Sequence, residues 1–210
     1  MRMLGRLAFP LYCWCMVVGS TRTRSMPRYI LRLLLDGLIS QPLYNIALNH
    51  TWSDLNVFFT LAIGLAGIWG LKEKRFGSHI WGPLAALCLA SWLKPDYGWK
   101  GVMLMMLLYA ARDSRGGIAG VMLAFSLFWG TSSSTVSSIC GFDTRTLLNM
   151  DVIGTLLTPW LKLQALSVLA LPLMLWQCNV SLRLPKVVGY LLYPGHLVLL
   201  FALEKLTGVL

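Results

Sequence analysis

The sequence has few charged residues. Asp, Glu, Lys and Arg make up 12% of its 210 residues, whereas a soluble domain carries about a quarter. Acidic residues are the scarcest of these, with 8 Asp and Glu against 18 Lys and Arg, so the formal net charge is +10. Hydrophobic residues reach 57% and the mean hydropathy is +0.67. This composition excludes a water-soluble globular domain and a disordered chain, and it predicts a helical integral membrane protein.

The sequence also lacks the motifs of soluble enzymes and of metal sites. Its five cysteines are an odd number and none is spaced as C-x-x-C, so they are interpreted as packing residues. It has no Gly-rich phosphate loop, no G-x-S-x-G elbow and no His, Cys and Asp cluster with metal spacing. We therefore predict no metal ligands.

Apolar runs predict how the chain crosses a bilayer. A spanning helix needs about 17–25 mostly apolar residues, and eight stretches approach or reach that length. They are Met3 to Ser20, Tyr29 to Leu48, Leu55 to Leu71, Ile80 to Leu93, Tyr97 to Ala111, Gly117 to Val136, Gln164 to Cys178 and Val187 to Leu203. The stretch from Thr146 to Leu163 is interpreted as an interfacial or half helix. The expected fold is all-α, a polytopic bundle of about eight transmembrane helices in a single domain over residues 1–210.

Basic residues lie in the short gaps between these runs, which is typical of membrane-flanking loops and gives no reason to expect a nucleic-acid partner. Alternate gaps hold Arg22, Arg24 and Arg28, then Lys72, Lys74 and Arg75, then Arg112 and Arg115, then Arg183 and Lys186. The positive-inside rule assigns these loops to the cytoplasm. The first helix would then start outside, which predicts either that the Arg22 to Arg32 block drives the N-terminus across or that a helix preceding Met1 is missing.

Ionisable residues inside membrane helices are costly, so each is a functional hypothesis. Arg28, Arg32 and Asp36 follow one another at four-residue spacing on one helix face, which predicts an Arg32–Asp36 pair. Gln41 and Asn45 continue this polar edge. The alternative is that Arg32 only snorkels to lipid phosphates.

His196 lies near the middle of the last apolar run, after Tyr193, Pro194 and Gly195. An imidazole at that depth is a candidate general base, although a lone histidine in a helix bundle also serves as an interhelical hydrogen-bonder. Arg6, Asn56 and Tyr97 also have ordinary explanations, as an interface residue, a residue near a helix start and part of an aromatic belt.

Several short motifs resemble one family in matching order over nearly the whole chain. They are Gly5-Arg6-Leu7-Ala8-Phe9-Pro10-Leu11-Tyr12, Gly19, Arg32-Leu33, Ile39-Ser40-Gln41-Pro42, Leu55-Asn56-Val57-Phe58-Phe59-Thr60, Asp96-Tyr97-Gly98-Trp99-Lys100-Gly101-Val102 and Tyr193-Pro194-Gly195-His196-Leu197. The set resembles the TraX family, whose best-known member acetylates the N-terminal amine of conjugative pilin.

The resemblance implies a bacterial inner-membrane protein, acetyl-coenzyme A as donor, and an amine or hydroxyl acceptor such as a pilin. It suggests that the site is lined by Arg6, Arg32, Gln41, Asn56, Tyr97 and His196. In this hypothesis His196 is the base, Arg32 held by Asp36 offers positive charge, and Gln41 and Asn56 orient the acceptor. The remaining candidates are Arg22, Arg24 and Arg28 for the coenzyme phosphates, unless they only anchor topology, and Arg6, Tyr97 and Tyr193 for the substrate.

One departure from the family pattern bears on activity. Family members usually begin with an additional helix that carries an Asp-His pair, and this sequence starts after it. We therefore expect either that Met1 lies inside a longer reading frame or that the protein is a shortened, inactive relative. Two other classes stay open: a membrane scaffold or substrate-handling subunit whose polar residues only join helices, and a small transporter.

Overall fold

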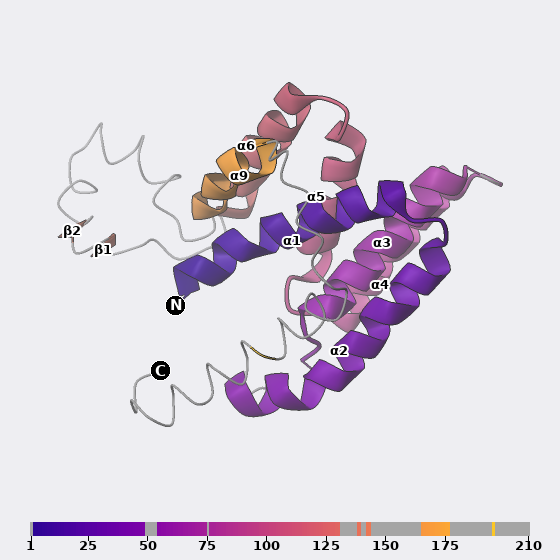
Figure 1. The fold of residues 1–210 in the computed structure, drawn as a ribbon, viewed down its shortest axis with the longest axis horizontal. Helices are drawn as coiled ribbons and strands as arrows, with labels where there is room; N and C mark the ends of the chain where they lie inside the picture. The colour runs from indigo at the N-terminus through magenta and orange to yellow at the C-terminus, as the bar shows by residue number, and fades with distance from the viewer. Residues whose placement is uncertain are drawn as a thin grey trace. The chain divides into compact units, whose positions relative to one another are not determined.

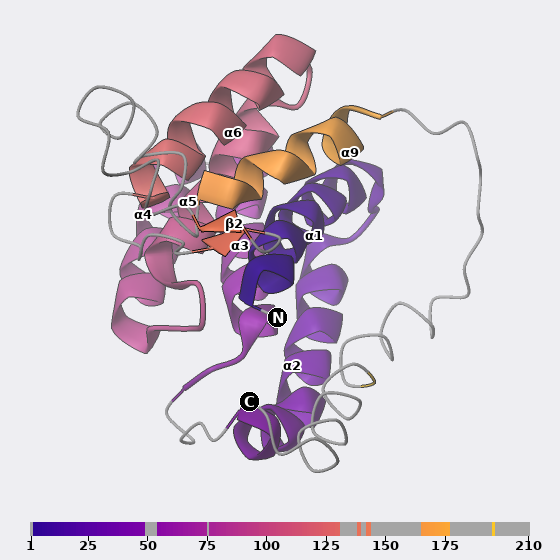
Figure 2. The same ribbon diagram turned by 90° about the vertical axis from the view of Figure 1, so that its left-hand side faces the viewer.

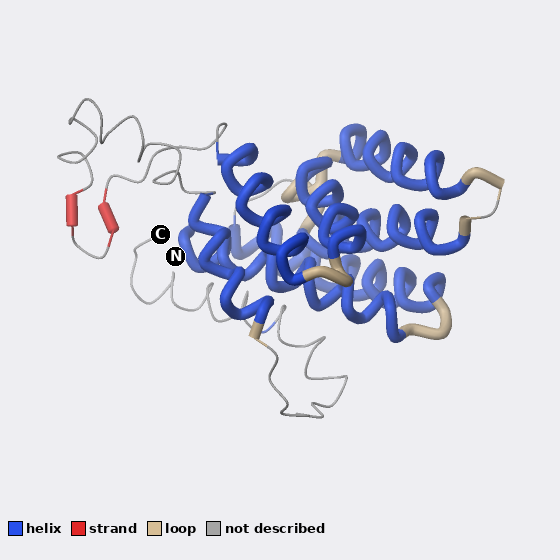
Figure 3. Tube along the Cα trace, turned by 90° about the horizontal axis from the view of Figure 1, so that it is seen from above, coloured by secondary structure: helices blue, strands red, loops and turns tan. Residues whose placement is uncertain are grey.

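Helices make up most of the described part of the chain in its computed structural model (Figure 3). The structure describes residues 2–48, 54–74, 76–130, 138–139, 142–143, 165–176 and 195. The helices are α1 (Arg2–Arg22), α2 (Met26–Leu48), α3 (Val57–Glu73), α4 (Ser78–Leu93), α5 (Gly98–Ala111), α6 (Arg115–Gly130), the 3-10 helix η1 (Ala165–Ala170) and α9 (Leu171–Leu175). Two short strands, β1 (Ser138–Ile139) and β2 (Phe142–Asp143), pair antiparallel.

The all-α prediction is confirmed by this architecture. The first five predicted runs coincide with α1 to α5 to within three residues at each end, and the sixth begins within two residues of α6. The seventh run, predicted as one helix, instead contains η1 followed by the short α9. The eighth run, and the predicted interfacial stretch 146–163, lie outside the described residues. Among the described helices, none combines the length and the apolar character needed to cross a membrane.

The chain divides into two compact units. The first unit comprises residues 1–19 and 107–177, and the second comprises residues 20–106 and 178–210. The boundaries fall within α1 and α5, so each of these helices contributes to both units. Each unit is described by itself below.

Helix α3 is the centre of the second unit, where α2, α3 and α4 lie side by side (Figure 1). It contacts α2 and α4, and a Cβ at Gly67 would meet both Ala86 of α4 and Met106 of α5. Residues around the whole helix are therefore buried from Val57 to Ile68, with the exception of Ala66 and Phe59. A helix that is apolar on all sides is expected in such a central position.

Two glycines let α3 and α4 approach each other closely. A Cβ placed on Gly70 would lie 2.8 Å from the Cα of Gly82 and 2.9 Å from the carbonyl oxygen of Ser78. The Ser78 hydroxyl donates a hydrogen bond to the Gly70 carbonyl at 3.0 Å. Small residues at a helix crossing permit this kind of backbone contact.

Replacing Gly70 with alanine is expected to lower the free energy of unfolding by about 1–3 kcal/mol, because the methyl group collides with backbone atoms that cannot move separately. Thermal unfolding of the purified protein measures the change. Gly120→Ala in α6 is the matched control, since a Cβ there meets no atom within 4 Å, and it should be neutral or stabilising by about 0.5–1 kcal/mol. Equal stability of Gly70→Ala and wild type would contradict the close packing.

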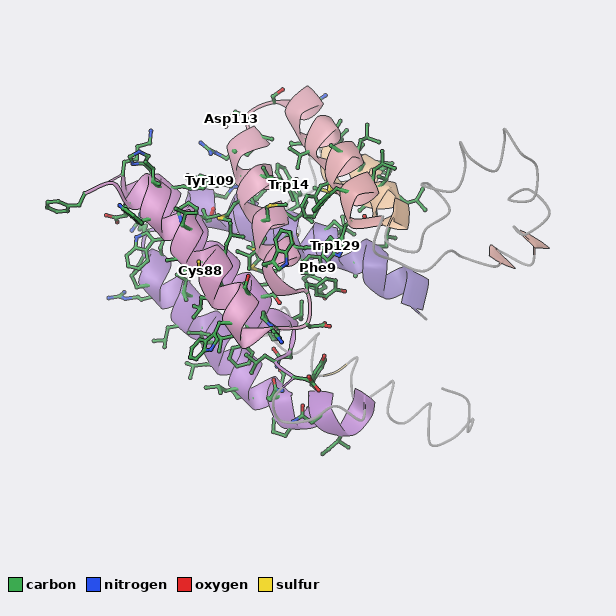
Figure 4. All side chains as sticks on the ribbon, turned by 180° about the vertical axis from the view of Figure 1, so that it is seen from behind. Phe9, Trp14, Cys88, Tyr109, Asp113 and Trp129 are labelled. Atoms are coloured by element: carbon green, nitrogen blue, oxygen red, sulfur yellow. The ribbon has the colours of Figure 1, made fainter. Side chains whose placement is uncertain are left out.

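Aromatic side chains fill the first unit. The Phe9 ring of α1 meets the Trp129 ring of α6 edge-to-face, with centroids 6.1 Å apart (Figure 4). Phe125 also contacts the Trp129 ring at 5.6 Å. Helices α6 and α9 lie side by side (Figure 2), and the hydroxyls of Ser126 and Ser167 share a buried hydrogen bond of 2.7 Å. This unit thus has its own apolar core.

Candidate functional site

Three segments of the second unit meet at one end of its helices. The last turns of α2 contact the Asp54–Asn56 segment that leads into α3, and the turn between α4 and α5 joins them through the Asp96 amide, which donates to the Leu55 carbonyl at 2.9 Å. We call this region the polar end. Its residues are Gly37, Gln41, Tyr44, Asn45, Asp54, Asn56, Thr60, Asp96 and Tyr97.

The Gln41 side chain forms hydrogen bonds with three other residues of the polar end. It is 6% exposed, and its Nε2 donates to Oδ1 of Asn45 at 3.0 Å and to the Asp54 carbonyl at 2.7 Å. Its Oε1 accepts the Asn56 backbone amide at 3.1 Å. Both amide hydrogens of Gln41 are therefore used inside the protein.

Asn56 joins α2 to the start of α3. It is fully buried, its Nδ2 donates to the Gly37 carbonyl at 2.7 Å, and its Oδ1 accepts the Phe58 amide at 3.0 Å. The second contact makes Asn56 the N-cap of α3, a position that asparagine favours because its side chain satisfies an unpaired amide of the first turn. The helix start and the helix pairing thus depend on one side chain.

Asn56→Ala is expected to reduce the free energy of unfolding by about 2–3 kcal/mol, since it removes the cap and leaves the buried Gly37 carbonyl without its donor. Asn56→Ser is the companion variant, because serine also caps helices and should recover part of the loss. Chemical denaturation followed by circular dichroism reports both values. If Asn56→Ala had the same free energy of unfolding as wild type, the hydrogen bonds of the Asn56 side chain would contribute nothing to stability.

Two buried polar atoms of α2 lack a hydrogen-bond partner. They are Nδ2 of Asn45 and Oδ2 of Asp36. A buried donor or acceptor without a partner costs about 1–3 kcal/mol, so such atoms need an explanation. Asn45 is 9% exposed, and its Oδ1 is already held by Gln41.

Two acidic side chains of the polar end are accessible to solvent. Asp96 is exposed and Asp54 is half-buried, whereas Tyr44 in the last turns of α2 is buried. The Tyr97 amide donates to the Thr60 hydroxyl at 3.4 Å, which fixes the turn that carries Asp96. The polar end therefore has a buried amide network at its base and carboxylates at its rim.

The opposite end of the second unit is basic. Arg22, Arg24 and Arg28 are exposed around the connection from α1 to α2. Lys72, near the end of α3, donates to the Ser20 carbonyl at 3.2 Å and so brings a fourth cation to this end. Because α3 begins beside the second half of α2 and ends beside the residues that precede α2, the two helices are antiparallel.

The structure brings together only some of the predicted site residues. Gln41, Asn56 and Tyr97 meet at the polar end, whereas the three arginines expected at the coenzyme phosphates lie at the basic end. The prediction that Arg32 pairs with Asp36 is wrong, since both residues are described and the structure does not bring them together. Arg32 is exposed, and the buried Oδ2 of Asp36 has no hydrogen-bond partner.

The remaining predictions fall on residues whose side chains are not described. Arg6 lies in α1, but only its backbone is described, and Tyr193 and His196 lie outside the described residues. Within the described ranges, no three His, Cys, Asp or Glu side chains are grouped as metal ligands.

Asp54, Asp96, Tyr44 and Thr60 were missed as site residues. The available signal was that Asp54 and Asp96 lie in the gaps that alternate with the basic ones, so the positive-inside rule puts both on the side opposite the basic loops. That pattern places them at one end of the bundle, but it does not show that backbone hydrogen bonds hold the two segments together.

Comparisons with known proteins agree with the motif resemblance. A family model described as TraX protein matches residues 1–204. A relative from Dichelobacter nodosus, described as "Probable fimbrial assembly protein FimC, serogroup H1", is 40% identical over 78 residues. That alignment covers 32% of this chain and 32% of the relative, so the chain spans about a third of the relative's length. No solved structure matches the chain.

Proposed function

The chain belongs to the TraX protein family, and from this premise we propose that it is a membrane acetyltransferase. It moves an acetyl group from acetyl-coenzyme A to an amine, such as the N-terminus of a conjugative pilin. The observation that carries the proposal is the family match over residues 1–204. The fimbrial description of the Dichelobacter nodosus relative supports a pilus-related acceptor.

We place the protein in the bacterial inner membrane, as a polytopic bundle of about eight helices in contact with lipid. The support comes from composition: 57% hydrophobic residues and 12% charged residues, with the basic residues gathered in alternate gaps between apolar runs. In this arrangement the basic end faces the cytoplasm, where acetyl-coenzyme A is supplied.

The proposed reaction is an acyl transfer. The acceptor nitrogen attacks the thioester carbonyl carbon, so a C–N bond forms, the C–S bond breaks, and the coenzyme leaves as a thiol. His196 takes the proton that the nitrogen loses and gives it to the departing thiolate, and Arg32 offers positive charge to the carbonyl oxygen as negative charge develops there. Arg22, Arg24 and Arg28 bind the coenzyme phosphates, which arginine recognises through paired hydrogen bonds.

Gln41 and Asn56 have positioning roles in this mechanism. Both side chains bind protein partners in the structure, so they hold the acceptor region in shape. This observation also favours the second candidate, a scaffold or substrate-handling subunit of a pilus or secretion system, in which the same amides only join helices.

The test compares the mass of the candidate pilin or surface peptide from cells with and without the gene. The transferase predicts that the mass of one acetyl group disappears with the gene and returns with a plasmid copy. An unchanged mass together with lost pilus assembly would favour the scaffold. Binding of acetyl-coenzyme A to the detergent-solubilised protein gives a second readout that does not depend on the choice of acceptor.

A further inference from the structure

Helix α4 has one face that stays exposed and is apolar along its length. The two tryptophans of this face, Trp81 and Trp92, are 70% and 80% exposed, and Figure 4 labels Cys88 between them. We call this face the outer stripe. Its residues repeat at the three-, four- and seven-residue spacings of one helix face, and they are Trp81, Leu84, Ala85, Cys88, Leu89 and Trp92. A contiguous exposed apolar surface of this kind marks an interaction site.

The opposite face of α4 shows how this chain builds a contact between helices. Gly82, Ala86 and Ala90 follow one another at four-residue spacing, and the two alanines are buried. Gly82 meets Gly70 of α3, and Ala86 lies beside Gly67 of the same helix. Helices that pack together in a membrane use such small residues, because these let the backbones approach each other. The outer stripe carries mainly leucine and tryptophan instead, which does not favour a second helix as its partner.

The outer stripe offers little to a polar partner. Between the two tryptophans, Ser91 is the one residue with an oxygen or nitrogen atom in its side chain. Its hydroxyl donates to the Leu87 carbonyl at 2.9 Å, within the same helix. The other side-chain donors are the indole N–H groups of the tryptophans, and an indole that loses contact with water needs an acceptor. A complementary occupant is therefore apolar along the helix and has acceptors near the two helix ends.

Lysines lie beyond both ends of the outer stripe. Lys74 caps α3 shortly before α4 begins, Lys94 caps α4 itself, and both are exposed. An apolar middle, a tryptophan near each end and a cation beyond it is typical of a helix in contact with a bilayer, because indoles favour the headgroup level and lysine stems extend to the phosphates. The charge at the two ends is thus complementary to phospholipid headgroups.

We propose that the outer stripe of α4 is a phospholipid-binding surface, with acyl chains packed between Trp81 and Trp92 and headgroup phosphates bound by Lys74 and Lys94. The inference rests on the membrane placement in the proposed function. Helix α4 has 16 residues, which is about 24 Å along its axis, whereas the hydrocarbon core of a typical bilayer is about 30 Å thick. The apolar layer beside α4 is therefore thinner than average, and phospholipids with short chains fit it best.

The first experiment attaches a nitroxide spin label to Cys88 of the full chain in phospholipid nanodiscs, with the other four cysteines replaced by alanine. Power saturation measures how often the label collides with oxygen, which dissolves among acyl chains, and with a nickel chelate, which stays in water. We expect the Cys88 label to collide mainly with oxygen. The control is a label on Asp113→Cys, a position in the other unit where the native side chain is 81% exposed, and it should collide mainly with nickel.

Two outcomes of this experiment would overturn the inference. A Cys88 label that collides mainly with nickel would place the outer stripe in water. A label shielded from both reagents would mean that protein covers the stripe, either a second copy of the chain or another segment of the same chain.

The second experiment measures lipid binding in the same nanodiscs through quenching of tryptophan fluorescence by brominated phospholipids. The quenching that disappears in the Trp81→Phe/Trp92→Phe double variant reports the outer stripe. Lipids with dimyristoleoyl chains should bind there more tightly than lipids with dioleoyl chains. Lys94→Gln should reduce the preference for phosphatidylglycerol over phosphatidylcholine about fivefold, the usual contribution of one lysine near an anionic membrane surface.

Arg115→Gln is the matched control, because it removes one exposed positive charge from the other unit. It should leave lipid preference at the outer stripe unchanged. Equal binding of both chain lengths would overturn the inferred thin layer, and an unchanged lipid preference in Lys94→Gln would overturn the headgroup contact. Acetyl-coenzyme A binding is measured on the same nanodiscs. Lost donor binding with a lipid-exposed Cys88 label would contradict the proposed function, whereas intact donor binding with a shielded label would contradict the inference alone.

Discussion

His196→Gln is expected to reduce acetyl transfer by about 10²–10⁴-fold, the usual contribution of a general base. Glutamine keeps a hydrogen-bonding group of similar reach but does not take up a proton at neutral pH. The substitution therefore separates the two interpretations of a lone histidine in a helix bundle, since an interhelical hydrogen-bonder tolerates glutamine and a base does not. The measurement is the rate of acetyl transfer to a peptide amine, with acetyl-coenzyme A binding recorded in parallel.

His79→Gln is the matched control for this prediction. His79 is an exposed residue in the first turn of α4, so its replacement should leave the transfer rate unchanged. Unaltered transfer in the His196 variant would remove that residue from the mechanism and leave the proton without its proposed acceptor. Weakened donor binding would instead place His196 at the coenzyme.

Helices α1 to α5 were predictable because each corresponds to an apolar run with clear ends. Helix α3, for example, starts after an asparagine that caps helices well. The approach of Gly70 to Gly82 was not predictable, since it depends on how two helices are rotated about their axes. Local sequence does not encode that rotation directly.

The candidate site shows the same limit. Gln41 was selected as part of a polar edge on its helix and Asn56 through the family resemblance, and the structure places them side by side. Most of their hydrogen bonds, however, are made with backbone atoms, those of Gly37, Asp54, Asn56 and Phe58. The Asp96 amide donates to the carbonyl of Leu55, which is far away in sequence, and this tertiary contact has no signal in local composition or spacing.

Replacing Arg22, Arg24 and Arg28 together with glutamine is expected to weaken binding of acetyl-coenzyme A about a hundredfold. Three exposed guanidinium groups are lost at the end where the coenzyme phosphates are proposed to bind. Binding by wild type should also weaken as salt is added, because exposed charges are screened within about 10 Å at 0.1 M ionic strength. Calorimetry on the detergent-solubilised protein measures both effects.

Acetyl-pantetheine is the matched ligand, because it carries the same thioester without the nucleotide phosphates. Its transfer should be equal in wild type and the glutamine variant. The corresponding triple lysine variant keeps the loop charge that sets membrane orientation, so it separates topology from phosphate recognition. It should recover only part of the affinity for acetyl-coenzyme A, because lysine lacks the paired donors of arginine. If the glutamine variant binds the coenzyme as tightly as wild type, these arginines act as membrane anchors and the phosphates bind elsewhere.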